Sequence, residues 1–266
     1  GSSTQDGCDP GTYQPNFASS SCIEASLGHY VENENATAQL SCISGTYQPN
    51  YASTSCIPAE PGHWVESDGS SQTQSCPLGT YGTSVGAVGI ETCISADPGY
   101  YVDSTGASSQ LECIAGTYNP VIGAISSADC LAADPGNYVE SSGSSEQTPC
   151  DLGTYQPNSG QIFCLESSSG TYVSNTGSSS VSDCSEGTYQ PNSGQSECID
   201  ASPGYFSSSV RASAQTPCLA GSYQPDTGSV TCLQADVGYH VPIEGQNMQT
   251  ICPAGQYQPQ PSSTEC

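Results

Sequence analysis

Apolar residues recur along this chain at fixed positions inside short segments of polar and turn-forming residues. Glycine stands two positions before an aromatic residue in fifteen Gly-x-aromatic triplets, such as Gly11-Thr12-Tyr13, and the aromatic residue is Tyr in twelve of them. Trp64, Phe206 and His240 fill the aromatic position in the other three. Apolar positions this sparse, with Gly, Pro and Asn-Ser-Gly turns between them, predict short hairpins and leave no room for a helix.

A second set of apolar positions follows every other cysteine. Each of these positions holds one aliphatic residue: Ile23, Ile57, Ile94, Leu131, Leu165, Ile199 and Leu233. We expect these residues and the aromatic residues to pack each hairpin on its neighbour, as in a one-dimensional solenoid. The Tyr-Gln-Pro stretches should be extended, because proline pushes the residue before it toward the β or polyproline region.

The cysteines impose a regular period on this pattern. They stand at Cys8, Cys22, Cys42, Cys56, Cys76, Cys93, Cys113, Cys130, Cys150, Cys164, Cys184, Cys198, Cys218, Cys232, Cys252 and Cys266. Successive gaps alternate between 14 or 17 residues and a constant 20, which predicts eight units of 34 or 37 residues. We expect a partial repeat end at 1–7, repeats at 8–41, 42–75, 76–112, 113–149, 150–183, 184–217 and 218–251, and a half repeat at 252–266.

Each full unit divides into two similar halves. The Gly-x-aromatic triplet occurs once after a cysteine and once after an alanine or serine, and the second half keeps a 14-residue spacing without cysteines. Its end positions are Ala25 and Gln39, Ala59 and Thr73, Ala96 and Gln110, Ala133 and Gln147, Ser167 and Val181, Ala201 and Gln215, Ala235 and Gln249. We interpret these pairs as former bridge positions. The disulfides should therefore join residues 8–22, 42–56, 76–93, 113–130, 150–164, 184–198, 218–232 and 252–266.

The composition predicts a thin core. Only 34% of the residues are hydrophobic, against about 45–50% in typical globular domains. A loop of this length closed by one disulfide is worth about 3 kcal/mol, so the bridges would replace the missing core. We expect a small, disulfide-rich, all-β or irregular fold, in the form of an elongated tandem-repeat rod of short β-hairpins. With two strands per half at about 4.8 Å, the rod would measure roughly 150 Å.

Cysteine usage also predicts the compartment. Zinc is the competing explanation for so many cysteines, but the closest pair is 14 positions apart, so the C-x2-C knuckles of zinc ribbons are missing. Disulfides indicate an oxidising location, extracellular or at the cell surface. The first residues do not follow the pattern of a signal peptide, and no apolar run could span a bilayer, so we expect a mature segment, or one cut from a longer chain, without membrane insertion.

Charge excludes two classes of partner. The chain has 26 acidic residues against a single basic residue, Arg211, which gives a formal net charge of −25. Such a field repels phosphate backbones and anionic lipids, so we expect no nucleic-acid or membrane-surface binding.

The motif C-x2-G-T-Y, as in Cys42-Ile-Ser-Gly45-Thr-Tyr47 and Cys150-Asp-Leu-Gly153-Thr-Tyr155, resembles the cysteine-rich repeats of ephrin-receptor-like ectodomains. It is also similar to the first half-module of tumour-necrosis-factor-receptor repeats. The resemblance covers essentially the whole chain and implies an elongated extracellular stalk or array, without indicating a ligand. In those families a second cysteine follows three residues after the closing one, where this chain has Ala25 or its equivalents.

The sequence offers little for catalysis. His29 and His63 occupy the variable middle of the Gly-x-aromatic triplet, and His240 takes the aromatic position itself. We interpret all three as repeat positions, since no Ser/His/Asp arrangement or Gly-x-Ser-x-Gly elbow accompanies them. We therefore expect no enzyme, no catalytic residue and no cofactor.

The acidic residues that follow the valine of the second half are Glu32, Glu66, Asp103 and Glu140. One carboxylate per repeat is too sparse for the six to eight oxygens that calcium requires. A solvated acidic stripe is the favoured interpretation, and weak calcium bridging between rods is the alternative. The regular tyrosines resemble sugar-stacking platforms, but their fixed spacing beside cysteines favours packing.

Asn35-Ala36-Thr37 is the single N-glycosylation sequon, which makes Asn35 a candidate glycan site. Clustered serines such as Ser178-Ser179-Ser180 suit O-glycans on a stalk, and plain turn serines are the equal alternative. Glycans are therefore expected partners.

These features favour a structural subunit of an extracellular fibre, hair or stalk that self-associates head-to-tail or laterally. A receptor or adhesin ectodomain that binds a protein or carbohydrate is the alternative, with the apolar insertions Val85–Ile90 and Val121–Ile125 as its candidate contacts. An ice-binding solenoid would need a threonine ladder, which does not recur. Gly1-Ser2-Ser3 precedes Cys8 just as Gly69-Ser70-Ser71 precedes Cys76, and the chain closes on Cys266. We therefore expect the array to continue at both ends.

Overall fold

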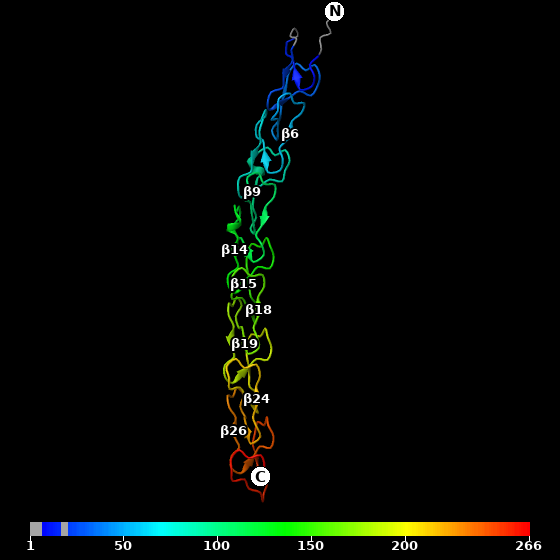
Figure 1. Cartoon of the computed structure of the whole chain (residues 1–266). Helices are drawn as coiled ribbons and strands as arrows, with labels where there is room; N and C mark the ends of the chain where they lie inside the picture. Colours follow the sequence, from blue (N-terminus) through cyan, green and yellow to red (C-terminus); the bar gives the residue numbers. More distant parts are fainter. Residues whose placement is uncertain (1–6, 17–20) are drawn as a thin grey trace, which may run out of the picture. The chain divides into compact units, whose positions relative to one another are not determined.

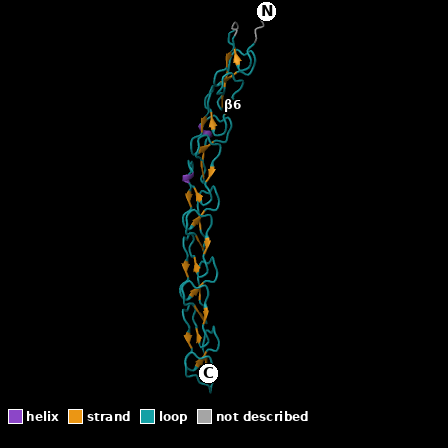
Figure 2. Cartoon of the chain, viewed as in Figure 1, coloured by secondary structure: helices purple, strands orange, loops and turns teal. Residues whose placement is uncertain are grey.

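The computed structural model describes residues 7–16 and 21–266. Gly1-Ser2-Ser3 and most of the expected partial repeat end at 1–7 therefore lie outside the described residues. In the described part of the chain, regular structure consists of two-residue strands and two three-residue 3-10 helices, joined by turns (Figure 2).

The strands in the first part of the chain are β1 (Thr12–Tyr13), β2 (Ile23–Glu24), β3 (His29–Tyr30), β4 (Leu40–Ser41), β5 (Thr46–Tyr47), β6 (Ile57–Pro58), β7 (His63–Trp64), β8 (Gln74–Ser75), β9 (Thr80–Tyr81), β10 (Ile94–Ser95), β11 (Tyr100–Tyr101), β12 (Leu111–Glu112), β13 (Thr117–Tyr118) and β14 (Leu131–Ala132). Those in the remainder are β15 (Asn137–Tyr138), β16 (Thr148–Pro149), β17 (Thr154–Tyr155), β18 (Leu165–Glu166), β19 (Thr171–Tyr172), β20 (Ser182–Asp183), β21 (Thr188–Tyr189), β22 (Ile199–Asp200), β23 (Tyr205–Phe206), β24 (Thr216–Pro217), β25 (Ser222–Tyr223), β26 (Leu233–Gln234), β27 (Tyr239–His240) and β28 (Thr250–Ile251). The two 3-10 helices are η1 (Ile90–Thr92) and η2 (Ser127–Asp129).

Each strand pairs with its neighbour in the chain to form a two-stranded sheet, and Trp64 of β7 also forms an isolated parallel bridge with Ala87. The register places the aromatic residue opposite the first residue of the second strand, for example Tyr155 opposite Leu165 in the antiparallel pair β17–β18. The prediction of a small, disulfide-rich fold of tandem short hairpins is confirmed.

The glycine before each hairpin is required by a tight turn. In the segment Asp151-Leu152-Gly153-Thr154, the Thr154 amide donates to the Asp151 carbonyl oxygen at 3.0 Å, and Gly153 adopts a φ of +80°. A β-turn with positive φ at its third residue favours glycine there. A Cβ atom on Gly153 would also overlap the carbonyl oxygen of Gly194, so two constraints exclude a side chain at this position.

Successive halves are joined by backbone hydrogen bonds. We call the segments that begin and end at cysteine bridged halves, and those that begin at alanine or serine unbridged halves. The bridged half at 150–164 donates from the Gly153 amide to the Val173 carbonyl at 2.9 Å, and the Gly177 amide returns a bond to the Cys150 carbonyl at 2.8 Å. Equivalent bonds recur between other successive halves. Since these bonds use only the backbone, they tolerate variation in the side chains.

Halves of the same kind also pack on one another. Gly153 of one bridged half lies against Gly194 of the next bridged half, and Gly136 of an unbridged half lies against Gly177 of the next unbridged half. We call the residue at the far turn of a half its tip residue. The carbonyl oxygen of the tip residue in the later half lies against the turn glycine of the earlier half of the same kind. Each of these halves therefore contacts the next half of its own kind as well as its immediate neighbour.

The chain divides into two compact units. One comprises the described residues up to Ile114 together with Tyr118–Leu131 and Ser142–Glu146, and the other comprises Ala115–Thr117, Ala132–Ser141 and Gln147–Cys266. Within each unit the hairpins follow one another in chain order (Figure 1). The finer division into seven and a half repeats stays a prediction.

The core is a line of small residues. Most opening residues are fully buried, including Cys42, Cys150, Ala96 and Ala201, each with 0% exposure. The valine after the aromatic residue is buried in the same way. These core valines are Val31, Val65, Val102, Val139, Val173 and Val241.

The expected packing role of the aliphatic residues after the closing cysteines is wrong. Ile23, Ile57, Ile94, Leu131, Leu165, Ile199 and Leu233 are 37–48% exposed. Direct backbone hydrogen bonds bring successive halves so close together that alanine, cysteine and valine fill the interface. The larger side chains lie on the outer face instead, opposite the half-buried tyrosines.

Candidate functional site

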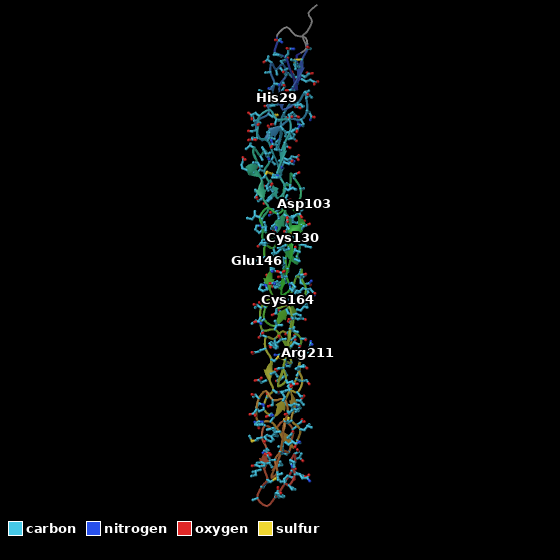
Figure 3. All side chains as sticks on the ribbon, turned by 90° about the vertical axis from the view of Figure 1, so that its left-hand side faces the viewer. His29, Asp103, Cys130, Glu146, Cys164 and Arg211 are labelled. Atoms are coloured by element: carbon cyan, nitrogen blue, oxygen red, sulfur yellow. A yellow bond between two sulfur atoms is a disulfide. The ribbon has the colours of Figure 1, made fainter. Side chains whose placement is uncertain are left out.

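The eight disulfides lie within the bridged halves. They join Cys8–Cys22, Cys42–Cys56, Cys76–Cys93, Cys113–Cys130, Cys150–Cys164, Cys184–Cys198, Cys218–Cys232 and Cys252–Cys266, and the two Cα atoms of each bridge lie 5.6–5.7 Å apart. This pairing is the one that the spacing of the unbridged halves predicts. The opening cysteine is buried, except for half-buried Cys252, and the closing cysteine, such as Cys164, is more accessible (Figure 3).

Most unbridged halves are closed by a glutamine side chain in place of the disulfide. The Gln147 Oε1 atom accepts from the Asp134 amide at 2.7 Å, and its Nε2 atom donates to Asp134 Oδ2 at 2.8 Å. Gln39, Gln110, Gln215 and Gln249 accept from the corresponding amide in the same way. We call this arrangement the glutamine clasp. The 14-residue spacing identifies these positions as equivalent to the bridging cysteines but does not predict the hydrogen bonds of the glutamines.

The glutamine of Tyr-Gln-Pro has a role that sequence reasoning missed. Gln156 is 2% exposed, its Nε2 atom donates to the Phe163 carbonyl at 2.8 Å, and its Oε1 atom accepts from the Asn158 amide at 3.1 Å. The side chain thus spans the loop inside the disulfide. The recurrence of the tripeptide was the available signal, since a buried amide must satisfy its hydrogen bonds.

The valine and isoleucine side chains of the two insertions in the 37-residue units are exposed, whereas the alanine in each insertion is buried. Val85 is 67% exposed and Ile122 is 66% exposed, and η1 and η2 follow within the same loops. The second insertion leads into a capping box, in which the Ser126 side chain accepts from the Ala128 amide and Asp129 accepts from the Ser126 amide. Local capping therefore fixes the backbone of this second loop, while its valine and isoleucine side chains remain in solvent.

The three histidines lie apart from one another in the repeat. His29 Nδ1 lies 3.2 Å from Ser26 Oγ, His63 Nδ1 lies 3.4 Å from the Pro61 carbonyl oxygen, and His240 Nδ1 lies 3.1 Å from the sulfur of Cys266. His240, Cys252 and Cys266 form the one group of three metal-ligand types among the described residues. Because both sulfurs are in a disulfide, neither is a thiolate that could bind a metal ion.

The predicted acidic stripe lies on the surface. Glu32, Glu66, Asp103 and Glu140 are exposed, and none of them belongs to a group of three or more metal-ligand types in the described residues. Arg211, the single basic residue, is exposed at the tip of an unbridged half (Figure 3). Its Nε atom lies 3.7 Å from the carboxylate of Asp183. An exposed ion pair of this kind contributes little to stability.

Asn35 stands at a tip position where most other halves have glycine. Its φ is +57°, its amide donates to the Cys8 carbonyl at 2.8 Å, and its side chain is exposed. Asparagine tolerates this left-handed conformation better than most residues. Its role as a glycan acceptor stays a prediction.

These features define a cysteine-rich array of tandem, disulfide-bonded hairpins. Residues 136–184 match the family model described as tyrosine-protein kinase ephrin type A/B receptor-like. The match gives this part of the chain the character of an extracellular, receptor-like or surface repeat. None of the curated proteins compared with the chain matches it. Among the described residues, no helix is long and apolar enough to cross a membrane.

Proposed function

We propose that this chain is a structural subunit of an extracellular, glycosylated fibre, hair or stalk, assembled by stacking of repeats. The observation that carries this proposal is the set of backbone hydrogen bonds between successive halves, such as those from Gly153 to Val173 and from Gly177 to Cys150. These backbone hydrogen bonds do not depend on which side chains lie on the outer face. The array therefore adds length without requiring a specific surface.

Three further features support this function. Bridged halves are each closed by their own disulfide, which favours durability outside the cell. The single basic residue, Arg211, leaves almost no site for proteases that cleave after Lys or Arg. The exposed Asn35 sequon suits a glycan. We propose that the chain is not an enzyme: the polar contacts of His29 and His63 lie within their own turns, and His240 lies against a disulfide rather than beside a free hydroxyl or thiol nucleophile.

Electron microscopy of the native material, with an antibody against this chain, tests the proposal. We expect the label along fibres or stalks, and a mobility shift after glycan removal that an Asn35→Gln variant abolishes. Label confined to dispersed monomers of 27 kDa would contradict the fibre function.

A receptor or adhesin ectodomain is the second candidate, and the exposed insertions at Val85–Ile90 and Val121–Ile125 favour it. In that case, a Val85→Ser, Ile122→Ser double variant would lose binding to the target cell or protein while keeping its fold. For a purely structural subunit, the same variant would leave the assembly unchanged.

A further inference from the structure

His240 brings an imidazole into contact with a disulfide. Its Nδ1 atom lies 3.1 Å from Sγ of Cys266, which is bonded to Cys252. The ligand atoms of all three residues lie within 4.8 Å of one another, and all three side chains are half-buried. The contact lies where the unbridged half at 235–249 meets the bridged half at 252–266, next to the hydrogen bond from the Val241 amide to the Ser263 carbonyl oxygen at 2.9 Å.

The repeat explains why an imidazole stands there. The aromatic position of an unbridged half lies beside the closing cysteine of the following bridged half, as shown by the groove that Tyr30 and Cys56 line together. Both pairs are separated by 26 residues in the sequence. Tyrosine, tryptophan or phenylalanine occupies this position in the other unbridged halves, and His240 alone offers an imidazole.

An imidazole at this distance suits thiol–disulfide exchange. Exchange begins when a thiolate attacks one sulfur of a disulfide, and it is faster when the departing sulfur is a better leaving group. An imidazolium can donate a proton to that sulfur as it departs. A tyrosine hydroxyl, which has a pKa near 10, is a much weaker acid for this purpose.

We propose that Cys252–Cys266 is a site of thiol–disulfide exchange, with Cys252 as the attacked residue and Cys266 as the leaving group. The thiolate of an external molecule forms a bond to Cys252 Sγ, and the Cys252–Cys266 bond breaks. The electron pair of that bond passes to Cys266 Sγ, which takes the proton from His240 Nδ1. The products are a mixed disulfide at Cys252, a thiol at Cys266 and a neutral imidazole, so no other oxidant or reductant is needed.

The charge of the chain limits which thiol reacts. Every cysteine of this chain is in a disulfide, so an intact second copy offers no thiol. A net charge of −25 attracts cations and repels anions. The matching reactant is therefore a cationic thiol, whether it is a small molecule or a cysteine in a basic segment of another protein.

The test uses the whole chain and the small cationic thiol cysteamine at a limiting concentration. After short reaction times, free thiols are alkylated and the peptides are mapped by mass spectrometry. We expect the cysteamine adduct on Cys252 and the alkyl group on Cys266 before any of the other disulfides reacts. Mercaptoethanesulfonate, an anionic thiol, should react more slowly.

Two variants separate the imidazole from the general accessibility of the bond. His240→Tyr restores the residue of the other halves and should slow the exchange at Cys252–Cys266 by about tenfold or more. His240→Phe introduces the residue that Phe206 provides in another unbridged half, and it should slow the exchange to a similar extent.

Either of two results would overturn the proposal. One is an unchanged rate at Cys252–Cys266 in the His240→Tyr variant, which would assign the reactivity to exposure alone. The other is an unchanged rate at the same disulfide in the His240→Phe variant, which remains a valid test even if His240→Tyr folds poorly.

Discussion

Glycine and the residue after the aromatic position determine how each half meets its neighbours. Gly153 combines a positive φ with contact to the Gly194 carbonyl. Gly160, at the tip of the same half, also has a positive φ, of +69°, but a Cβ atom there would fit, with its nearest neighbour 3.8 Å away. Asn35, Ala52 and Arg211 occupy equivalent tips. The tip position therefore requires only a residue that tolerates a positive φ. The turn position requires glycine for a second reason, because no side chain fits there.

Asparagine placed at each of the two glycine positions distinguishes the need for a positive φ from the need for a missing side chain. Gly153→Asn should lower the free energy of unfolding by about 2 kcal/mol or more, because it adds steric overlap to the strained backbone. Gly160→Asn should cost about 1 kcal/mol or less, because asparagine tolerates the left-handed region. Urea denaturation of both variants measures the difference, and equal losses would contradict the close approach of Gly153 to Gly194.

The sequence identified the turn glycines and the cysteines, because a fixed spacing predicts them directly. It did not predict which apolar residues face inward. Leu165 and Val173 are both aliphatic, yet the first is 38% exposed and the second 2%. Strands of two residues are too short for an alternating pattern to indicate the buried face. The choice depends on the close backbone approach of neighbouring halves, which composition does not reveal.

Each hairpin is closed either by a disulfide or by a glutamine clasp. The two devices occupy the same place, since Ala133 and Gln147 have the 14-residue spacing of Cys150 and Cys164. A hydrogen bond contributes about 1 kcal/mol net, and a disulfide closing a loop of this length about 3 kcal/mol. The unbridged halves are therefore the weaker elements, stabilised mainly by contacts with their bridged neighbours.

A ninth disulfide should form where the clasp now stands. In the double variant Ala133→Cys, Gln147→Cys, the new cysteines should pair with each other, leave no free thiol and raise the free energy of unfolding by up to about 3 kcal/mol. Thiol titration and peptide mapping detect the pair, and denaturation measures the gain. Ala133→Ser, Gln147→Ser is the matched control and should be less stable than the natural chain. Two free thiols in the cysteine variant would show that the unbridged half lacks the geometry of a bridged one.

At the scale of the whole chain, stability is a sum of local terms. Each half contacts its immediate neighbours through backbone bonds and the next half of its own kind through the glycine and the tip. Such arrays follow nearest-neighbour energetics, in which repeats contribute separately and interfaces couple them. Each disulfide also closes within a single half, so its contribution to stability is local as well. An array built in this way needs no large hydrophobic core.

The central claim is that each bridged half closes its own disulfide, and peptide mapping without reduction tests it most directly. A protease that cleaves after acidic residues suits this chain, since Glu24, Glu60, Asp97, Asp134, Glu166, Asp200 and Asp236 lie between successive bridged halves. The account predicts linked peptides only at the 14- and 17-residue spacings, such as Cys150–Cys164. A bridge across a 20-residue gap, such as Cys22 to Cys42, would contradict it.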